Sequence, residues 1–257
     1  LHQRWRSIGA QFLLSGTVVS AGGQLVVEAR LIDLVSGEFA FAKRYRAGLS
    51  ATEVVAHTLA NDLVQVFTGR PGPFLSRIAF VSNRSGASEL WMMDWNGSNQ
   101  RQLTKHGSIA LAPSWSRDGR HLAFTSYLRG APAIFLLTPQ EGYLRQLWDK
   151  GGVNSSPSIS PDGTKVVFAS SIDGNVDIWV VPFEGGQAQR LTTARGIDTQ
   201  PAWAPNGRQI AFTSTRAGTP QIYLMDADGT NVRRLSFDGP FHDEAEWALD
   251  GTRVVCT

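Results

Sequence analysis

The sequence predicts a mainly β fold, in which a β-propeller follows a small α/β domain. Four segments, beginning at Trp115, Ile159, Trp203 and Trp247, repeat at an interval of 44 residues without a gap. An Asp-Gly or Asn-Gly pair follows at the same place in each segment, and such pairs are typical of hairpin turns. A repeat of about 40 to 50 residues with four short strands has the length of a propeller blade. Residues 1–70 lack the repeat and are expected to form the α/β domain.

The first 70 residues are expected to contain a three-stranded sheet. Apolar side chains alternate with more polar ones along the second of these strands, which predicts one face that is more polar than the other. Glycine-containing turns separate the strands, which are expected at residues 12–19, 25–33 and 39–45.

A helix is expected after the third strand. Ser50 or Thr52 is its predicted cap, and apolar residues at helical spacing extend it to about Phe67. The segment 71–76, which contains Pro and Gly, is predicted to link the α/β domain of residues 1–70 to the propeller.

The repeat predicts about four and a half blades between residues 77 and 257. In each complete unit the first strand is expected to line the central channel and the fourth to lie at the outer rim. The first unit has no matching channel strand, and we expect a segment beyond the end of this sequence to supply it. The predicted units are 77–104, 112–148, 156–192, 200–236 and the partial unit 244–257.

Composition excludes several classes of protein. Charged residues make up 18% of the chain and the net charge is +2 without a Lys/Arg run, which argues against a disordered chain and against a nucleic-acid-binding protein. No apolar run reaches the roughly 18 residues of a membrane span. Cys256 is the only cysteine, so the chain has no intramolecular disulfide. Because the sequence starts at Leu1 and stops inside an apolar strand pattern, we expect it to be a piece of a longer chain.

Sequence patterns for catalysis are absent. The chain has no Gly-x-Ser-x-Gly elbow, no His-Glu-x-x-His, no cysteine pair and no phosphate-binding glycine loop. The five histidines are dispersed, and only His242 stands beside acidic residues in a predicted loop. We therefore expect no catalytic residue, no metal site and no cofactor.

The repeat and the N-terminal stretch together resemble the TolB family, periplasmic proteins of the bacterial Tol–Pal envelope system. The blade pattern at Pro157–Phe168 matches that family but also other propellers, and its proline is replaced by Arg117 and Leu249 in two units. The order of segments is more specific and extends the resemblance over all 257 residues. These segments are Gly16–Val19, Val26–Leu34, a helix ending at Phe67–Gly69, and Arg77–Phe80.

The resemblance implies a six-bladed propeller in the full-length protein, which acts as a non-enzymatic periplasmic adaptor. It implies that the lipoprotein Pal docks at the channel mouth and that an N-terminal tail, absent here, recruits TolA. It also implies roles in outer-membrane integrity and in constriction during cell division. By the family pattern, Pal contacts residues just before each inner strand, and these polar positions are also expected in loops that converge on one opening. The candidates are Asn154, Ser155, Ser156, Asp198, Thr199, Gln200, His242, Asp243 and Glu244.

Two other functions remain open. The repeats also suit the propeller of a prolyl-oligopeptidase-like serine peptidase, which would need a hydrolase domain carrying a Ser-His-Asp set. A sensor or glycan-binding propeller is the third candidate. The N-terminal α/β segment favours the adaptor over the peptidase, and direct glycan-binding assays would distinguish the third candidate.

Overall fold

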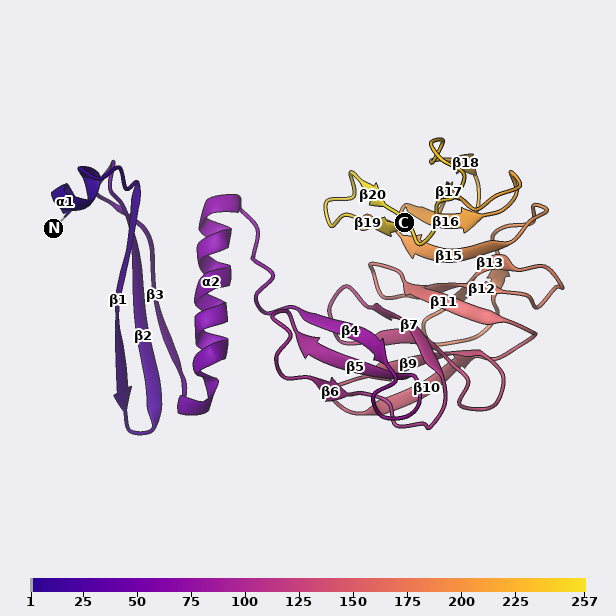
Figure 1. Ribbon diagram of the computed structural model, residues 1–257, viewed down its shortest axis with the longest axis horizontal. Helices are drawn as coiled ribbons and strands as arrows, with labels where there is room; N and C mark the ends of the chain where they lie inside the picture. Colours follow the sequence, from indigo (N-terminus) through magenta and orange to yellow (C-terminus); the bar gives the residue numbers. More distant parts are fainter. Residues whose placement is uncertain (1) are drawn as a thin grey trace. The chain divides into compact units, whose positions relative to one another are not determined.

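The computed structural model describes residues 2–257, which are mainly β, as predicted (Figure 1). The chain divides into two compact units. One contains Leu1–Ile78 with Met93–Asn99, and the other contains Ala79–Met92 with Gln100–Thr257. Within the described residues, no helix combines the length and the hydropathy that crossing a bilayer requires.

The first unit contains a three-stranded antiparallel sheet in the order β1-β2-β3. The three predicted strands are confirmed, and each is one to three residues longer than predicted. A short helix that the sequence did not indicate precedes them. The elements are α1 (His2–Arg6), β1 (Phe12–Ala21), β2 (Gln24–Asp33) and β3 (Phe39–Gly48).

Helix α2 (Thr52–Thr68) follows the sheet and confirms the predicted helix. Its predicted side-chain cap is wrong, because Ala51 occupies the capping position and makes no side-chain hydrogen bond. The hydroxyl of Thr52 instead donates to the carbonyl oxygen of Leu49 at 2.9 Å. The helix packs on the sheet through one apolar cluster, formed by Leu25, Ala29, Tyr45 and Val55.

The blades are five separate sheets, which we number 1 to 5 along the chain. Blade 1 has three strands and no inner strand, blades 2 to 4 have four strands each, and blade 5 has two, in agreement with the prediction. Blade 1 is β4 (Arg77–Ser82), β5 (Glu89–Asp94) and β6 (Arg101–Gln102); blade 2 is β7 (Ala110–Trp115), β8 (Leu122–Ser126), β9 (Ala133–Thr138) and β10 (Tyr143–Trp148); blade 3 is β11 (Asn154–Ile159), β12 (Lys165–Ser170), β13 (Asp177–Pro182) and β14 (Gln189–Arg190); blade 4 is β15 (Asp198–Trp203), β16 (Gln209–Ser214), β17 (Gln221–Asp226) and β18 (Arg233–Arg234); blade 5 is β19 (Glu246–Trp247) and β20 (Val254–Val255).

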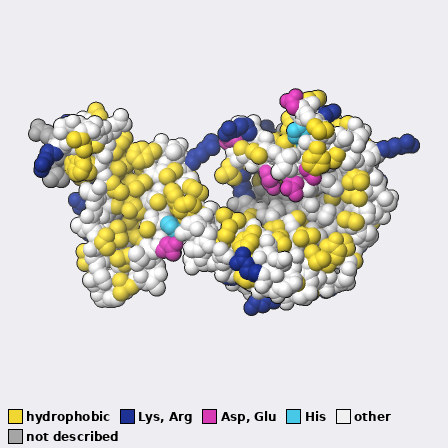
Figure 2. All heavy atoms as spheres, in the orientation of Figure 1, with side chains coloured by type: hydrophobic (Ala, Val, Ile, Leu, Met, Phe, Trp, Pro, Cys, Tyr) yellow, Lys and Arg dark blue, Asp and Glu magenta, His cyan; other side chains and the backbone are white. Residues whose placement is uncertain are grey.

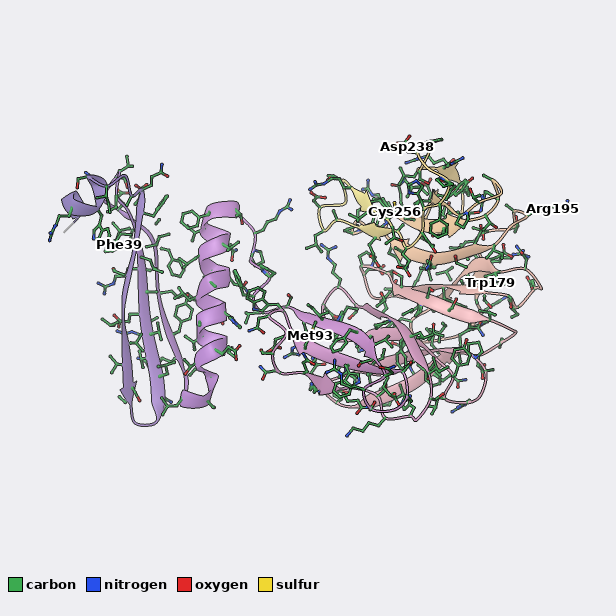
Figure 3. All side chains as sticks on the ribbon, in the orientation of Figure 1. Phe39, Met93, Trp179, Arg195, Asp238 and Cys256 are labelled. Carbon is green, nitrogen blue, oxygen red and sulfur yellow. The ribbon has the colours of Figure 1, made fainter. Side chains whose placement is uncertain are left out.

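The hydrophobic core lies between neighbouring blades. Because successive side chains of a strand point to opposite faces, Phe168 packs against residues of blade 2 while Val167 packs against residues of blade 4. Trp179, labelled in Figure 3, belongs to the same cluster as Phe168 and therefore packs between blades 2 and 3. Phe124, Phe168 and Phe212 occupy one repeat position and are all fully buried.

The turns between inner and second strands repeat one hydrogen-bonded pattern. In blade 3 the hydroxyl of Ser160 donates to Asp162 Oδ1 at 2.6 Å, and the backbone N–H of Thr164 donates to the same oxygen at 3.0 Å. These hydrogen bonds, the one from Ser160 first, hold the pKa of Asp162 below its ordinary value. Gly163 supplies the left-handed backbone of the turn, with φ 72°.

Replacing Asp162 with asparagine, which blade 4 carries at the equivalent Asn206, is expected to remove an acid-sensitive contribution to stability. Because the folded-state pKa is lowered, the carboxylate stabilises the fold above the unfolded pKa near 4, and this stabilisation disappears as the pH falls through the folded pKa. The side chain is exposed, so the loss should stay below about 1 kcal/mol. Urea unfolding at about pH 6 and about pH 3 measures it. If the variant lowers the free energy of unfolding by the same amount at both pH values, this explanation is contradicted.

Candidate functional site

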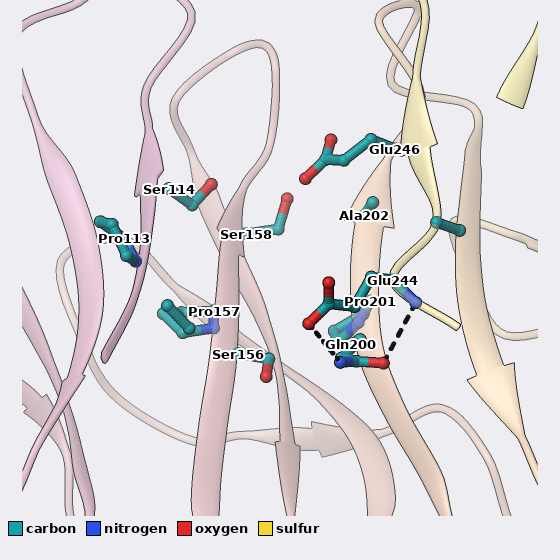
Figure 4. Close-up of a pocket in the computed structure, with 12 residues that line it drawn as sticks. Pro113, Ser114, Ser156, Pro157, Ser158, Gln200, Pro201, Ala202, Glu244 and Glu246 are labelled. Atoms are coloured by element: carbon teal, nitrogen blue, oxygen red, sulfur yellow. Dashed lines mark hydrogen bonds between the residues drawn. The ribbon is translucent and has the colours of Figure 1, made fainter. Parts of the chain in front are cut away.

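The inner strands β7, β11, β15 and β19 border one hollow of about 250 Å³ in the propeller unit (Figure 4). β11 lies beside both β7 and β15, and β15 in turn contacts β19. Four blades therefore contribute to a single concave surface at the position predicted for the channel.

One backbone feature recurs in all four inner segments of this hollow. Ala112, Ser156, Gln200 and Glu244 have φ of 49°, 51°, 50° and 54°, and they stand 44 residues apart. Left-handed backbone in residues other than glycine costs about 1–3 kcal/mol at each position. Its repetition in blades 2 to 5 indicates one shared local geometry of the inner segments.

A β-bulge accounts for this left-handed backbone. In blade 3, Ser155 pairs with Ala169 and Ser158 with Val167, so that β11 advances three residues while β12 advances two. The extra residue lies at Ser156–Pro157, and blades 2 and 4 shift register at the equivalent place. Side chains normally alternate between the faces of a strand, and a bulge breaks that alternation. Consecutive residues of one strand can therefore border the same hollow.

Three consecutive residues from each inner segment line the hollow. They are Ala112, Pro113, Ser114, Ser156, Pro157, Ser158, Gln200, Pro201, Ala202, Glu244, Ala245 and Glu246. The side-chain amide of Gln200 connects two blades, because its Nε2 donates to Glu244 Oε1 and its Oε1 accepts from the backbone N–H of Glu244, both at 3.3 Å. Figure 4 shows these two hydrogen bonds.

The charged residues of the hollow are acidic. Glu244 and Glu246 line it and no Lys or Arg does, and Figure 2 shows acidic side chains gathered at a hollow of the propeller unit. Desolvation by the surrounding protein raises the pKa of Glu246, although the residue is exposed by surface area. Within residues 2–257, no three His, Cys, Asp or Glu side chains are grouped so that they could hold a metal ion.

The structure corrects the predicted location of six candidate residues. Asn154–Ser156 begin β11 and Asp198–Gln200 begin β15, so they belong to strands and not to loops. The pairing starts early because the hydroxyl of Ser170, across the ladder, donates to Asn154 Oδ1 at 2.7 Å. Only His242, Asp243 and Glu244 lie in irregular backbone.

The candidates separate into three repeat positions with different surroundings. Asn154 and Asp198 occupy the first position and are 0% and 1% exposed; Asp198 accepts a hydrogen bond from Arg216 Nη2 at 2.8 Å. His242, at the same position in blade 5, is half-buried, and its Nδ1 lies 3.5 Å from Cys256 Sγ. Each of these side chains contacts another segment of its own blade, and Asn154 Nδ2 also donates to the carbonyl oxygen of Pro132 in blade 2 at 3.1 Å.

The second and third positions are more accessible. Ser155, Thr199 and Asp243 occupy the second position and are half-buried, but they do not line the hollow. The third position, Ser156, Gln200 and Glu244, does line it. Sequence reasoning thus found one of the three lining positions in blades 3, 4 and 5, and none in blade 2.

The missed lining residues follow the same repeat. Ser114, Ser158 and Glu246 stand two residues after the left-handed position, and Ala112 is the blade 2 counterpart of Ser156. The 44-residue register could have identified all of them once the left-handed position was known. The bulge itself has no signal in the sequence, because none of the four left-handed residues is Gly or Asn.

Comparison with protein families gives two matches. The family described as the TolB beta propeller domain matches residues 64–257, and the TolB amino-terminal domain matches residues 1–39. The Tol-Pal system protein TolB of Geobacter sulfurreducens is 40% identical over 118 residues, which are 46% of this chain and 27% of that protein. The matched region thus spans about a quarter of the length of such relatives.

Comparison with solved structures also finds a TolB protein. The crystal structure of TolB from Acinetobacter baumannii superposes with a TM-score of 0.90 at 28% identity, covering all of this chain and 65% of that one. A prolyl endopeptidase superposes with a TM-score of 0.51 at 11% identity over 77% of this chain and 38% of that one, a likeness that shows the fold alone.

Proposed function

Because the chain belongs to the TolB family, we propose that it serves as a periplasmic protein-binding adaptor of the Tol–Pal system, without catalytic activity of its own. The relatives that carry the name Tol-Pal system protein TolB support this proposal. The partner we propose is the lipoprotein Pal, and further proposed roles in outer-membrane integrity and constriction at division depend on that partnership. Recruitment of TolA by an N-terminal tail belongs to the same proposal.

The hollow bordered by the inner strands is the proposed docking surface. The single observation that carries this assignment is the left-handed residue repeated at one position of four inner segments. Strained backbone is retained where surrounding structure or function requires it, and here it brings consecutive residues of each blade to one concave surface. Rigid scaffolds with convergent polar groups are common binding sites.

The geometry narrows the set of proposed contacts. Ser156, Gln200 and Glu244 line the hollow and are accessible to a partner. Asn154 and Asp198 are buried, and we propose that they position the bulged strands from within the blades without contacting the partner. Glu246, which sequence reasoning missed, joins the contact set because it lies two residues beyond Glu244 on the same surface.

Replacing Glu244 with lysine is expected to weaken Pal binding by at least about tenfold, because it reverses the charge of a side chain that lines the hollow and breaks its contact with Gln200. Isothermal titration calorimetry with purified Pal measures the dissociation constant. Glu184→Lys is the matched control, because Glu184 is exposed and lies outside the hollow.

Two results would contradict the proposed surface. Equal binding by the parent and Glu244→Lys would place the contacts elsewhere, and equal weakening by Glu184→Lys would indicate a general charge effect. If the parent does not bind Pal at all, the proposed partner is wrong.

A further inference from the structure

A second concave site lies at the end of the inner strands opposite to the bulges, where each strand turns into the next. Between the turns of blades 3 and 4 is a crevice of about 420 Å³, which we call the turn-face crevice. Residues Asp162, Lys165, Trp203 and Asn206 border it, together with Arg117 from blade 2.

Arg117 reaches the turn-face crevice across an intervening blade. It occupies the repeat position that is proline in blades 3 and 4, namely Pro161 and Pro205. Its Nη1 donates to the carbonyl oxygen of Pro205 at 2.9 Å, 88 residues along the chain. A guanidinium group has five N–H donors in a planar fork, so this contact holds one edge of the group at the crevice and leaves other donors for a ligand.

A neighbouring crevice shows which side chains distinguish the turn-face crevice. The crevice between blades 2 and 3 measures about 310 Å³, and the ring of His121 lies 5.2 Å from that of Phe183, edge to face, on its wall. At the equivalent positions the turn-face crevice has Lys165 and Ala227. Exchanging an aromatic ring for a methyl group accounts for the greater room. Exchanging His for Lys adds a permanent positive charge.

The charges of the turn-face crevice favour an anion. Within residues 2–257, neither Arg117 nor Lys165 forms a salt bridge. Asp162 is the only acidic residue on the lining, and its Oδ1 is occupied by the hydroxyls of Ser160 and Thr164 and by a backbone N–H. Arg117 also lines the neighbouring crevice, but there it faces three carboxylates, those of Asp118, Asp162 and Glu184, and no lysine.

We propose that the turn-face crevice binds a carboxylate group of a small molecule or of a peptide end. The planar fork of Arg117 matches the two oxygens of a carboxylate, and Lys165 supplies a second cation from the adjoining turn. Trp203, of which 9% of the surface is exposed, provides an apolar wall for the carbon atoms next to the carboxylate. This site uses none of the residues of the hollow proposed for Pal, so the two assignments can fail independently.

The probe for this site is N-acetylglycine, which carries a carboxylate. N-acetylglycinamide is the uncharged control of the same shape, and inorganic phosphate tests whether another anion binds instead. We expect N-acetylglycine to produce a saturable shift of the Trp203 indole N–H resonance, assigned with Trp203→Phe, at millimolar concentration. Arg117→Pro, which restores the residue of blades 3 and 4, and Lys165→Gln should each raise the dissociation constant by about fivefold or more. Ala227→Phe should abolish the shift although it keeps every charge.

Arg120→Gln is the control for general electrostatics, because Arg120 is exposed in a neighbouring turn and does not line the crevice. The dissociation constant for N-acetylglycine should be the same for the Arg120→Gln variant as for the parent. The proposal is overturned if no saturation occurs below about 100 mM, if the amide binds as well as the acid, or if Arg120→Gln weakens binding as much as Lys165→Gln. Saturable binding of phosphate without saturable binding of N-acetylglycine would overturn the carboxylate assignment. Retained binding by Ala227→Phe would place the ligand outside the crevice.

Discussion

Replacing Phe168 with alanine is expected to lower the free energy of unfolding by about 3–5 kcal/mol, the largest single effect that we anticipate for this chain. The side chain is fully buried, and its ring lies 5.7 Å from that of Trp148 in the core between blades 2 and 3. Removing the ring loses the transfer free energy of the buried carbons and leaves a cavity, because two hydrogen-bonded sheets cannot close around it.

Urea denaturation followed by tryptophan fluorescence measures this loss. Val153→Ala is the control, because Val153 is 45% exposed and its replacement should change stability by no more than about 0.5 kcal/mol. A loss below about 1 kcal/mol for Phe168→Ala would show that the blades do not depend on the core between them.

Replacing Arg190 with glutamine, the residue at the equivalent positions 102 and 146, is expected to cost about 3 kcal/mol near neutral pH. The carboxylate of Asp177 is fully buried and accepts a hydrogen bond from Arg190 Nη2 at 2.5 Å. Without Arg190 that carboxylate retains only neutral donors, such as the hydroxyl of Thr192 at 3.3 Å. An unpaired charge in a buried site is strongly destabilising.

The pH dependence of the Arg190→Gln variant tests the same explanation. Burial raises the pKa of Asp177, Arg190 opposes that rise, and nearby Asp198 adds to it. Since the folded-state pKa lies above the unfolded value near 4, the folded state binds more protons between the two values, and stability from this group increases as the pH falls through that window. The cost of the variant should therefore shrink toward about pH 4.

Asp177→Asn in the Arg190→Gln background should restore part of the lost stability, because it removes the buried charge. Arg190→Lys keeps a positive charge and should cost less than Arg190→Gln. A cost for Arg190→Gln that is independent of pH, with no recovery in the double variant, would contradict the role assigned to this ion pair.

The repeat allowed most of the propeller to be predicted from local signals. β7, β11 and β15 start at intervals of 44 residues, as do the third strands β9, β13 and β17. Each blade carries its own turn residues and its own alternation of apolar side chains, so strand pairing follows from segments close in sequence. The strands and the helix of the α/β unit were predicted from local signals in the same way. The cap of α2 was not, because the hydroxyl of Thr52 donates to the carbonyl oxygen of Leu49 instead of capping its own helix.

The candidate site was predicted less completely, because it depends on how strands of different blades meet. The polar candidate residues lie at or just before the start of the strands that border the hollow, but Asn154 and Asp198 are buried within the blades. The sequence pattern could not distinguish them from Gln200 and Glu244, since all are polar and follow one repeat. The extra residue of the bulge decides which of them faces the hollow.

By itself, the sequence determined the period and the strand content, because these depend on hydrogen bonding and hydrophobic alternation within single blades. The order of segments from Gly16 to Phe80 indicated the TolB family. Only the tertiary structure decided that Glu246 lines the hollow, that Asp177 and Arg190 form a buried pair, and that Arg117 spans two blades to Pro205. These contacts depend on the size and charge of side chains that different blades bring together, and no spacing along one blade encodes them.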